Sequence, residues 1–498
     1  MGGQGGAFLD RFGLDRLGRH EALAGLTAVV LLVAATVGAF SNDPGPTSPS
    51  AIASAGPDTT FDPLGDLGPL ESATAGPGER PGQATVGAPA TTSPPLAPPG
   101  AKRVLGPAKG TPVKVGVHVN DNSGAGAQFG VGGLPNISDA ELTAVIKQVN
   151  AAGGLSGRPI EPIFHRTDPL NGSFDAQGQA ACETFTDDND AQIVIDNALS
   201  PSKVVLDCLV KRKIPLVWEL HMSQVTNAEM ARYMDYLYRP SMPNADRLDF
   251  VIDGLNGAKF FKGARVGILR YDSPESKLIS DKAFKPRLKA LGIPVVAEVP
   301  MTKPTSSGGA AGLAGQSSNA VLEFNDKDVS HVLFVPSGGA IPLTFLPAAA
   351  SQGYEPAYAF TTQDAPDFIG QNFPESQLSK AMVVGWAPDL DGDDFPRGAA
   401  LARCKKSQAD AGLPWDDNMQ PYCDAFYFLH ASLYNFDVVS AANLKKGAEA
   451  LGSSYESPFV LATEFGPGRH DGPKQARMLR YDAAKPGWRY FGSIFSFN

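Results

Sequence analysis

The sequence predicts an α/β protein with two successive lobes, preceded by an apolar segment and a long linker. From residue 113 onward, short β-branched runs alternate with amphipathic helical patterns, and a second such series follows the first. Before residue 113 the chain is rich in Pro, Gly, Ala, Ser and Thr. Alternating strands and helices are typical of a parallel sheet covered by helices. A chain of 498 residues also exceeds what one core usually serves, so two or three units are expected.

The net charge of -10 excludes a function that depends on a basic surface. Phosphate binding requires an excess of Lys and Arg on some face, and the sequence has no basic run. We therefore expect no nucleic-acid partner, and we interpret the acidic balance as a solubility feature.

The N-terminal part contains one long apolar run, Ala22–Phe40, without a charged residue. It is just long enough to span a hydrocarbon core of about 30 Å. Three arginines precede it, and no Lys or Arg follows until Arg80, which places residues 1–21 in the cytoplasm and the rest outside. The alternative is a signal peptide removed near Val37–Ala39. Both interpretations predict an extracytoplasmic body, either anchored to the cell membrane or secreted.

Residues 41–112 contain few large apolar side chains. Such a segment cannot bury enough surface to offset its conformational entropy. We expect a disordered, partly extended spacer between the apolar run and the folded body.

The first lobe is expected to have the order βαβαβαβ. Its best-defined helix follows Ser138-Asp139, which can cap it, and Gly153-Gly154 ends it. The expected strands are Val113–Val119, Pro159–His165, Ala191–Asp196 and Ile214–Leu220.

A second series of strands follows the aromatic segment at Tyr233–Tyr238. After this series, the region Met419–Leu451 is predicted to be helical, and two strands are predicted in the C-terminal tail. The strands of the second series are Ala264–Tyr271, Ile293–Val299, Ser330–Val335, Pro356–Thr361 and Ala381–Trp386.

The four cysteines form two local pairs, Cys182 with Cys208 and Cys404 with Cys423. Their spacings match no zinc or redox motif. Export favours disulfides, each contributing roughly 3 kcal/mol on the chain-entropy model. Four buried free thiols are the alternative.

The folded part resembles a known family through an ordered series of motifs. The most specific is a KVGV strand, then a helix that ends in VNAAGGLSGRPIE, then a strand that leads to Asp168-Pro169. Weaker matches are FKGARVGILRYDSP, LKALGIPVVAE, VVGWAPDLDG and YCDAFYFLHASL. The stretch from Val113 to Asn498 resembles the type I periplasmic solute-binding proteins, the group of the leucine/isoleucine/valine-binding protein.

The resemblance implies two Rossmann-like lobes joined by three hinge crossings, so that each lobe is discontinuous. Lobe I would comprise 113–240 with 389–460, and lobe II 241–388 with 461–498. A small ligand would be captured in the cleft between the lobes and delivered to an ABC-type permease. The resemblance implies neither an enzymatic activity nor a cofactor.

Candidate ligand contacts are the polar or aromatic residues that follow the expected strands, because ligands of open parallel sheets bind at the carboxyl ends of strands. In lobe I these are Asn120, Asp121, Asn122, Ser123, Asn197, Ser200, Glu219 and His221. In lobe II and at the third crossing they are Tyr271, Asp272, Ser337, Gln363, Asp364 and Trp386. Structural alternatives are a helix cap for Ser200, turn chemistry for Asp121–Ser123, a mutual ion pair for Glu219 and His221, and core packing for Trp386.

The loops after the third and fourth strands read DNALSPS and ELHMS, which departs from the amino-acid-binding members of the family. Their acidic and amide side chains favour a polar or amine-bearing ligand over a plain branched-chain amino acid. The rival function is a sensory or scaffold ectodomain of the same fold that acts through a membrane partner.

Enzyme and metal sites are disfavoured by the motifs. Gly124–Gly130 lacks the third glycine of a dinucleotide loop, and no P-loop, nucleophile-elbow or metalloprotease motif is present. Four aspartates, Asp389, Asp391, Asp393 and Asp394, lack the spacing of an EF-hand, so a solvated crossover loop is expected there. We expect no catalytic residue and no metal.

Overall fold

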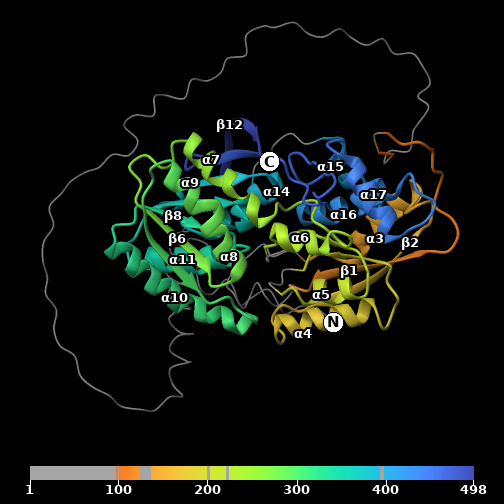
Figure 1. Ribbon diagram of the computed structural model, residues 1–498, viewed down its shortest axis with the longest axis horizontal. Coiled ribbons are helices and arrows are strands. Elements are labelled where there is room, and N and C mark those ends of the chain that lie inside the picture. The colour runs from red at the N-terminus through yellow and green to blue at the C-terminus, as the bar shows by residue number, and fades with distance from the viewer. Residues whose placement is uncertain are drawn as a thin grey trace, which may run out of the picture. The chain divides into compact units, whose positions relative to one another are not determined.

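The computed structural model describes residues 97–98, 100–122, 136–198, 202–219, 224–392 and 398–497 (Figure 1). The expected anchor at Ala22–Phe40, and the part of the expected spacer before residue 97, lie outside the described residues. Within the part that is described, no helix is both long and apolar enough to cross a membrane.

Lobe I, as we call the body built on the first sheet, has five parallel strands in the order β2-β1-β3-β4-β5. Two helical layers enclose this sheet: α3, α16 and α17 share one hydrophobic core with it, and α4, α5 and α6 share another. The strands are β1 (Val113–Asn120), β2 (Ile160–Thr167), β3 (Ile193–Asp196), β4 (Leu216–Trp218) and β5 (Leu237–Tyr238). The helices are α3 (Asp139–Ala151), α4 (Phe174–Phe185), α5 (Val204–Lys211), α6 (Asn227–Tyr233), α15 (Ala399–Asp410), α16 (Gln420–Leu433) and α17 (Ala441–Leu451), with the 3₁₀ turn η7 (Asp417–Met419) before α16.

The first helix of lobe I begins and ends where the sequence predicts. Ser138 caps α3: its hydroxyl oxygen accepts the backbone N–H of Glu141, and its own backbone N–H donates to the Glu141 carboxylate, which completes a capping box. Gly153 and Gly154 both have positive φ, and a Cβ at Gly154 would lie 2.0 Å from the carbonyl oxygen of Arg158. Only glycine allows this turn, which returns the chain directly into β2.

Lobe II is built on a seven-stranded sheet in the order β12-β11-β10-β9-β8-β6-β7. Strands β6 to β10 run parallel, whereas β11 pairs antiparallel with both β10 and β12. The strands are β6 (Val266–Tyr271), β7 (Val295–Met301), β8 (His331–Phe334), β9 (Ala357–Thr361), β10 (Met382–Gly385), β11 (Gln475–Tyr481) and β12 (Trp488–Ser496).

Helices also cover both faces of the lobe II sheet. The segments α7, η5 and α9 pack on one face, and α10 and α11 pack on the other (Figure 1). The bounds are η4 (Ala245–Arg247), α7 (Asp249–Gly257), α8 (Pro274–Leu278), η5 (Ile279–Phe284), α9 (Lys285–Ala290), α10 (Ser307–Asp326), α11 (Ala340–Ser351), η6 (Thr362–Asp364), α12 (Pro366–Asn372), α13 (Glu375–Leu378) and α14 (Pro388–Asp391).

The chain passes between the two sheets three times. It leaves the first sheet after β5, returns to the core of lobe I after β10, and enters the second sheet again at β11. The C-terminal strands therefore belong to the second sheet, although α15 to α17, which precede them, pack in lobe I.

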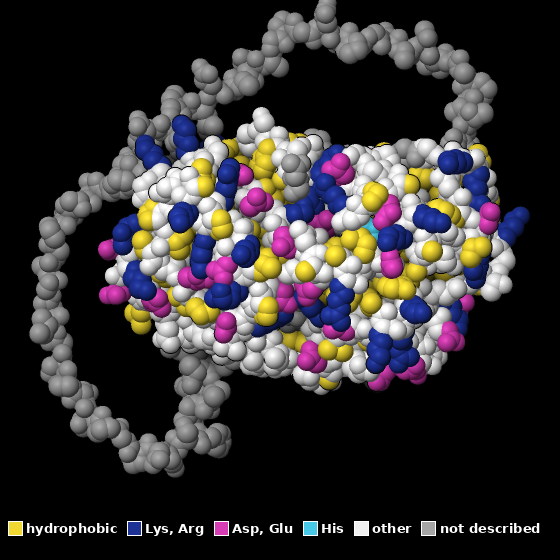
Figure 2. All heavy atoms as spheres, in the orientation of Figure 1, with side chains coloured by type: hydrophobic (Ala, Val, Ile, Leu, Met, Phe, Trp, Pro, Cys, Tyr) yellow, Lys and Arg dark blue, Asp and Glu magenta, His cyan; other side chains and the backbone are white. Residues whose placement is uncertain are grey.

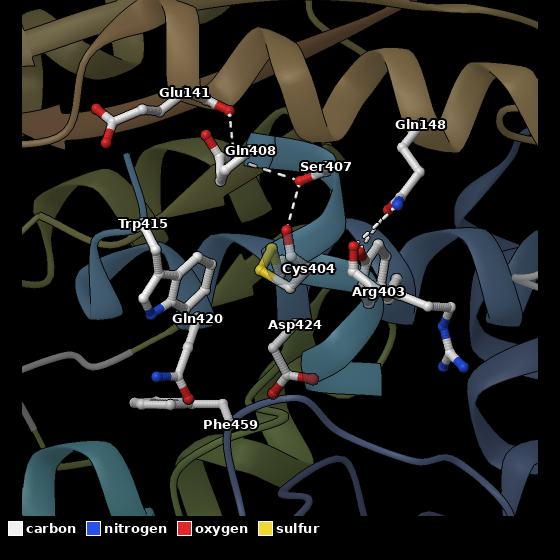
Figure 3. Close-up of a disulfide and its surroundings, with 12 residues drawn as sticks. Glu141, Gln148, Arg403, Cys404, Ser407, Gln408, Trp415, Gln420, Asp424 and Phe459 are labelled. Carbon is white, nitrogen blue, oxygen red and sulfur yellow. Dashed lines mark hydrogen bonds between the residues drawn. A yellow bond between two sulfur atoms is a disulfide. The ribbon is translucent and has the colours of Figure 1, made fainter. Parts of the chain in front are cut away.

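Both expected disulfides are present, and both lie in lobe I. Cys182 joins α4 to Cys208 on α5, and Cys404 joins α15 to Cys423 on α16. Figure 3 shows the second disulfide, with Ser407 and Gln408 beside it and Asp424 of α16 below it. Each bridge links two helices on the same face of the sheet.

Two differences from the sequence prediction concern short segments. The strand β5 is only two residues long, so the aromatic segment that contains it gave no periodic signal. The expected spacer reached residue 112, but residues 102–108 pack on lobe I, where the Arg103 guanidinium donates to the carbonyls of Tyr434 and Phe436. The Pro- and Gly-rich composition of this segment gives no periodic apolar pattern, so its packing on lobe I could not be predicted. The attachment depends on single hydrogen bonds and not on a buried apolar stripe.

The visible face of the protein carries charges of both signs. Lys and Arg side chains alternate with Asp and Glu side chains, and no single-sign field dominates this face (Figure 2). The distribution agrees with the interpretation of the acidic balance as a solubility feature.

Candidate functional site

The carboxyl ends of β1 and β3 form one wall of a small cavity. Asn120 ends β1, Asn122 follows it and Asn197 follows β3, and all three line a cavity of about 30 Å³. The other lining residues come from the segment before α3, from η7 and α16, and from the second and third crossings. They are Ile137, Asp389, Leu390, Asn418, Pro421, Tyr422 and Phe459. A volume of this size holds one or two water molecules.

The amide of Asn197 is positioned by Tyr422. A hydrogen bond joins the Asn197 side chain to the Tyr422 hydroxyl, and burial raises the pKa of that hydroxyl. The Asn197 Oδ1 atom has no hydrogen-bond partner among the described residues. Because an amide has both donors and acceptors, this pair leaves acceptor capacity beside the cavity.

The acidic residue that ends β3 is engaged inside lobe I. Asp196 Oδ1 lies 3.1 Å from His118 Nδ1 and accepts the backbone N–H of Ala198. His118 Nε2 in turn lies 2.7 Å from the Thr167 hydroxyl oxygen. His118, Asp196 and Thr167 are only 2%, 1% and 5% exposed, so this group cross-links β1, β2 and β3 and is closed to solutes. The sequence prediction did not include His118, because one histidine in an apolar strand carries no motif.

Glu219 follows β4 and is fully buried beside another carboxyl group, that of Asp424. Burial, and then the charge of Asp424, raise the pKa of Glu219 well above its usual range, although Ser241 and Arg239 act in the opposite direction. Burial raises the pKa of Asp424 to about 7, and its Oδ1 accepts the Tyr455 hydroxyl at 2.6 Å. This pair therefore holds a proton at neutral pH.

The acid pair lies where two crossings meet lobe I. Arg239 and Ser241 belong to the first crossing, and Tyr455 to the third. Figure 3 shows Asp424 between the disulfide of α16 and Phe459, which lines the cavity. Sequence reasoning did not find Asp424, because it lies within an apolar helix and its partner is about 200 residues away.

The candidates of lobe II lie in different environments. Asp364 is fully buried and accepts hydrogen bonds from the backbone N–H and hydroxyl of Thr361, and burial raises its pKa to about 6. Its Oδ1 also receives the backbone N–H of Ser337. The Tyr271 hydroxyl is buried, with no hydrogen-bond partner among the described residues, whereas the Asp272 side chain is 75% exposed.

Gln363 contacts the other lobe directly. Its Oε1 accepts the Nε2 of Gln224 at 3.1 Å, and both side chains are buried. Gln224 belongs to lobe I and precedes α6, so this bond closes the space between the two sheets.

Trp386 packs at the second crossing, directly after β10, and not at the third as expected; it does not line the cavity. It is fully buried, its indole N–H donates to the carbonyl of Ser241, and its ring lies edge-on to Phe250. These contacts join the second crossing to the first. Its contact with a ligand stays a prediction.

Three candidates, Ser123, Ser200 and His221, lie outside the described residues, as do Asp393 and Asp394. The expectation of a solvated loop is wrong for Asp391, which is fully buried and accepts hydroxyl groups from Thr362 and Tyr490. In the described ranges no group of His, Cys, Asp and Glu side chains could hold a metal ion.

Comparison with known proteins agrees with this architecture. A family profile described as "Periplasmic binding protein" matches residues 112–486. No curated protein matches the sequence.

Solved structures share the fold at low sequence identity. A branched-chain amino acid ABC transporter protein from Thermus thermophilus with bound valine is 14% identical, with a TM-score of 0.57 over 78% of this chain and 97% of that one. An ABC transporter substrate-binding protein from Desulfitobacterium hafniense in complex with Leu is 15% identical, with a TM-score of 0.54 over 76% of this chain and 100% of that one.

A solute-binding protein from Rhodopseudomonas palustris BisB5 in complex with 3,4-dihydroxy benzoic acid is also 15% identical, with a TM-score of 0.55 over 77% and 97% of the two chains. The family match covers the first sheet, the second sheet except β12, and all three crossings. This chain belongs to the periplasmic binding protein family, whose members are binding proteins and not enzymes.

Proposed function

We propose that this protein captures a small polar solute, amino-acid-like or related, between its two lobes and delivers it to an ABC-type permease. The observation that carries the proposal is the amide-lined cavity at the carboxyl ends of β1 and β3, at the crossings between the lobes. In open α/β sheets this is the edge at which ligands bind.

The lining supports a ligand with both donors and acceptors. Asn120, Asn122 and Asn197 contribute carboxamides, and Tyr422 contributes a hydroxyl. The apolar groups of Ile137, Leu390 and Phe459 complete the wall. Asp389 adds a carboxyl group to this lining, so a polar or amine-bearing solute fits better than an anionic one.

Entry of a solute requires the lobes to separate. The cavity has room for only one or two water molecules, and a hydrogen bond between Gln224 and Gln363 bridges the lobes. Hinge bending at the three crossings supplies such a motion in proteins of this shape. The proposal therefore includes an open form that admits the solute and a closed form that retains it.

The predicted anchor at Ala22–Phe40 completes the proposal. It would hold the body outside the cell membrane, beside the permease, with residues 41–96 as a spacer. Cleavage near Val37–Ala39 would instead release the protein from the membrane.

The first test is a thermal-shift screen of the full chain against amino acids, amides, polyamines, sugars and aromatic acids. A ligand at about 100 times its Kd adds roughly 2.7 kcal/mol to the folded state, which raises Tm measurably. We expect a selective hit whose shift is lost in Asn197→Ala. Asn256→Ala, at an exposed position on α7, is the matched control and should keep the shift.

Absence of a shift across the panel would contradict solute binding and favour the sensory or scaffold function. A hit that Asn197→Ala leaves unchanged would place the ligand elsewhere. Binding of branched-chain amino acids alone would contradict the polar-ligand specificity.

A further inference from the structure

A lysine of lobe I reaches a glutamate of lobe II outside the cavity. Lys203 immediately precedes α5, and Glu275 lies in the first turn of α8. The Lys203 ammonium donates a hydrogen bond to Glu275 and another, 2.6 Å long, to Glu229 of α6 in its own lobe. None of the three residues lines the cavity.

Partial burial strengthens this contact beyond that of an exposed ion pair. The side chains of Lys203 and Glu275 are each 17% exposed. Burial alone would raise the pKa of Glu275, but the hydrogen bond and charge of Lys203 lower it below its usual value. Charge-assisted hydrogen bonds that are shielded from water are stronger than pairs on an open surface.

Lobe I holds the lysine in place for this contact. Glu229 is fixed by the capping box of α6, in which its carboxylate accepts the backbone N–H and hydroxyl of Thr226. Glu229 therefore presents a fixed acceptor to the Lys203 ammonium. Of these two bonds of Lys203, only the one to Glu275 joins the two lobes.

Neighbouring contacts close the same edge of the two sheets. The backbone N–H of Phe174 donates to the carbonyl of Thr305 at 2.9 Å, and Ser173 forms an isolated antiparallel bridge with Ser306. Ser173 follows β2 and Thr305 follows β7, just as Lys203 follows β3 and Glu275 follows β6. These contacts all join the carboxyl end of one sheet to that of the other.

We propose that Lys203 and Glu275 form an electrostatic clasp that holds the two lobes closed. They act as positioning residues, which set how long a solute is retained without touching it. The consequence for affinity rests on the proposed function, because a clasp favours binding only if the closed form retains the solute.

Other charges surround the clasp and determine which variant tests it best. Asp175 accepts the Ser202 hydroxyl at 2.7 Å beside Lys203, and Lys303 of lobe II lies near Glu275. Burial and the neighbouring Lys203 lower the pKa of Lys303, whereas Glu275 raises it. Because Lys303 remains available to Glu275 when Lys203 is removed, Glu275→Gln is the cleaner change.

The clasp is tested by a distance measurement between the lobes of the full chain, without any solute. Spin labels on Lys211→Cys and Lys289→Cys, both exposed, report the separation of the lobes by pulsed electron resonance. Glu275→Gln should lower the ratio of closed to open molecules about tenfold, the size expected for one shielded charge-assisted hydrogen bond. Lys203→Met should shift the distribution in the same direction.

Glu323→Gln is the matched control. It neutralises a glutamate of lobe II whose ion pair with Lys327 lies at the exposed end of α10, away from the clasp. We expect the parent distance distribution in this variant. Identical distributions for the parent and Glu275→Gln would overturn the clasp, as would equal opening in Glu323→Gln.

Failure of the clasp and failure of solute binding are distinguishable in these measurements. The distances are recorded without solute, so they do not depend on the thermal-shift screen. A negative thermal-shift screen together with a shifted Glu275→Gln distance distribution would contradict solute binding and support the clasp. A positive screen with unchanged distances would support solute binding and contradict the clasp.

Discussion

Single buried residues carry much of the specific chemistry of this protein. Glu219 and Asp424 are both fully buried, with one guanidinium, that of Arg239, among their close neighbours. Two ionised carboxylates in such a site would cost several kcal/mol, so one proton is retained. The stability of the junction between the two crossings therefore depends on pH through the protonation of this pair.

The first prediction concerns this pair and the pH dependence of stability. Folding raises the pKa of Asp424 to about 7, so the folded state favours the protonated carboxyl. The stability that this preference gives the protein is fully present below the pKa of the unfolded chain and is lost as pH rises through the pKa of the folded protein. The free energy of unfolding should therefore fall between about pH 5 and pH 8. Glu219→Gln removes one acid and should stabilise the protein at pH 8 by roughly 1–3 kcal/mol relative to the parent.

Urea unfolding at pH 5 and pH 8 measures the effect. Asp364, whose pKa is raised to about 6, titrates in the same range but is common to both proteins, so it cancels in the difference. Glu323→Gln, which changes an exposed intrahelical pair, should follow the parent curve. Parallel pH curves for the parent and Glu219→Gln would contradict the shared proton.

At the scale of elements, close helix packing depends on a few small residues. Helices α16 and α17 both pack on the same core of lobe I. Gly447 of α17 faces the end of α16, and a Cβ there would lie 1.7 Å from the carbonyl oxygen of Ser432. The two helices can approach only because this position lacks a side chain.

The second prediction compares two glycines in helices. Gly447→Ala should destabilise the protein by about 1–3 kcal/mol or more, because the added methyl group forces the backbones apart. Gly312→Ala in α10 meets nothing within 4 Å, and the higher helix propensity of alanine should leave stability equal or up to about 1 kcal/mol higher. Denaturant melts of both variants give the comparison, and equal effects would refute the packing argument.

At the scale of the whole molecule, the two lobes have different covalent support. Both disulfides lie in lobe I, and they account for all four cysteines of the sequence. Lobe II therefore depends on its non-covalent core of aliphatic and aromatic side chains, among them Phe334 stacked on Phe360.

The third prediction follows from this asymmetry. Reduction should lower the stability of lobe I by roughly 3 kcal/mol for each bridge and leave that of lobe II nearly unchanged. Hydrogen exchange with and without reductant checks this, with β1 and β3 as reporters of lobe I and β8 and β9 as reporters of lobe II. Equal loss of protection in both sheets would show instead that the lobes unfold as one unit.

Local sequence determined most elements of this protein and the pairing of its cysteines. Strands such as β1 and β6 are β-branched runs long enough to be distinguished, and the capping box and glycines of α3 specify its ends without help from the rest of the chain. The domain boundaries and the ligand contacts stay predictions.

Only the tertiary structure decided which polar residues are free to contact a ligand and which are buried and hydrogen-bonded inside a lobe. Asp196, Asp364 and Asp391 follow strands or crossings as ligand contacts would, yet each is buried and bonded inside its own lobe. The acid pair and the clasp join residues that are far apart in the chain. Their chemistry depends on distances and burial, which local periodicity does not encode.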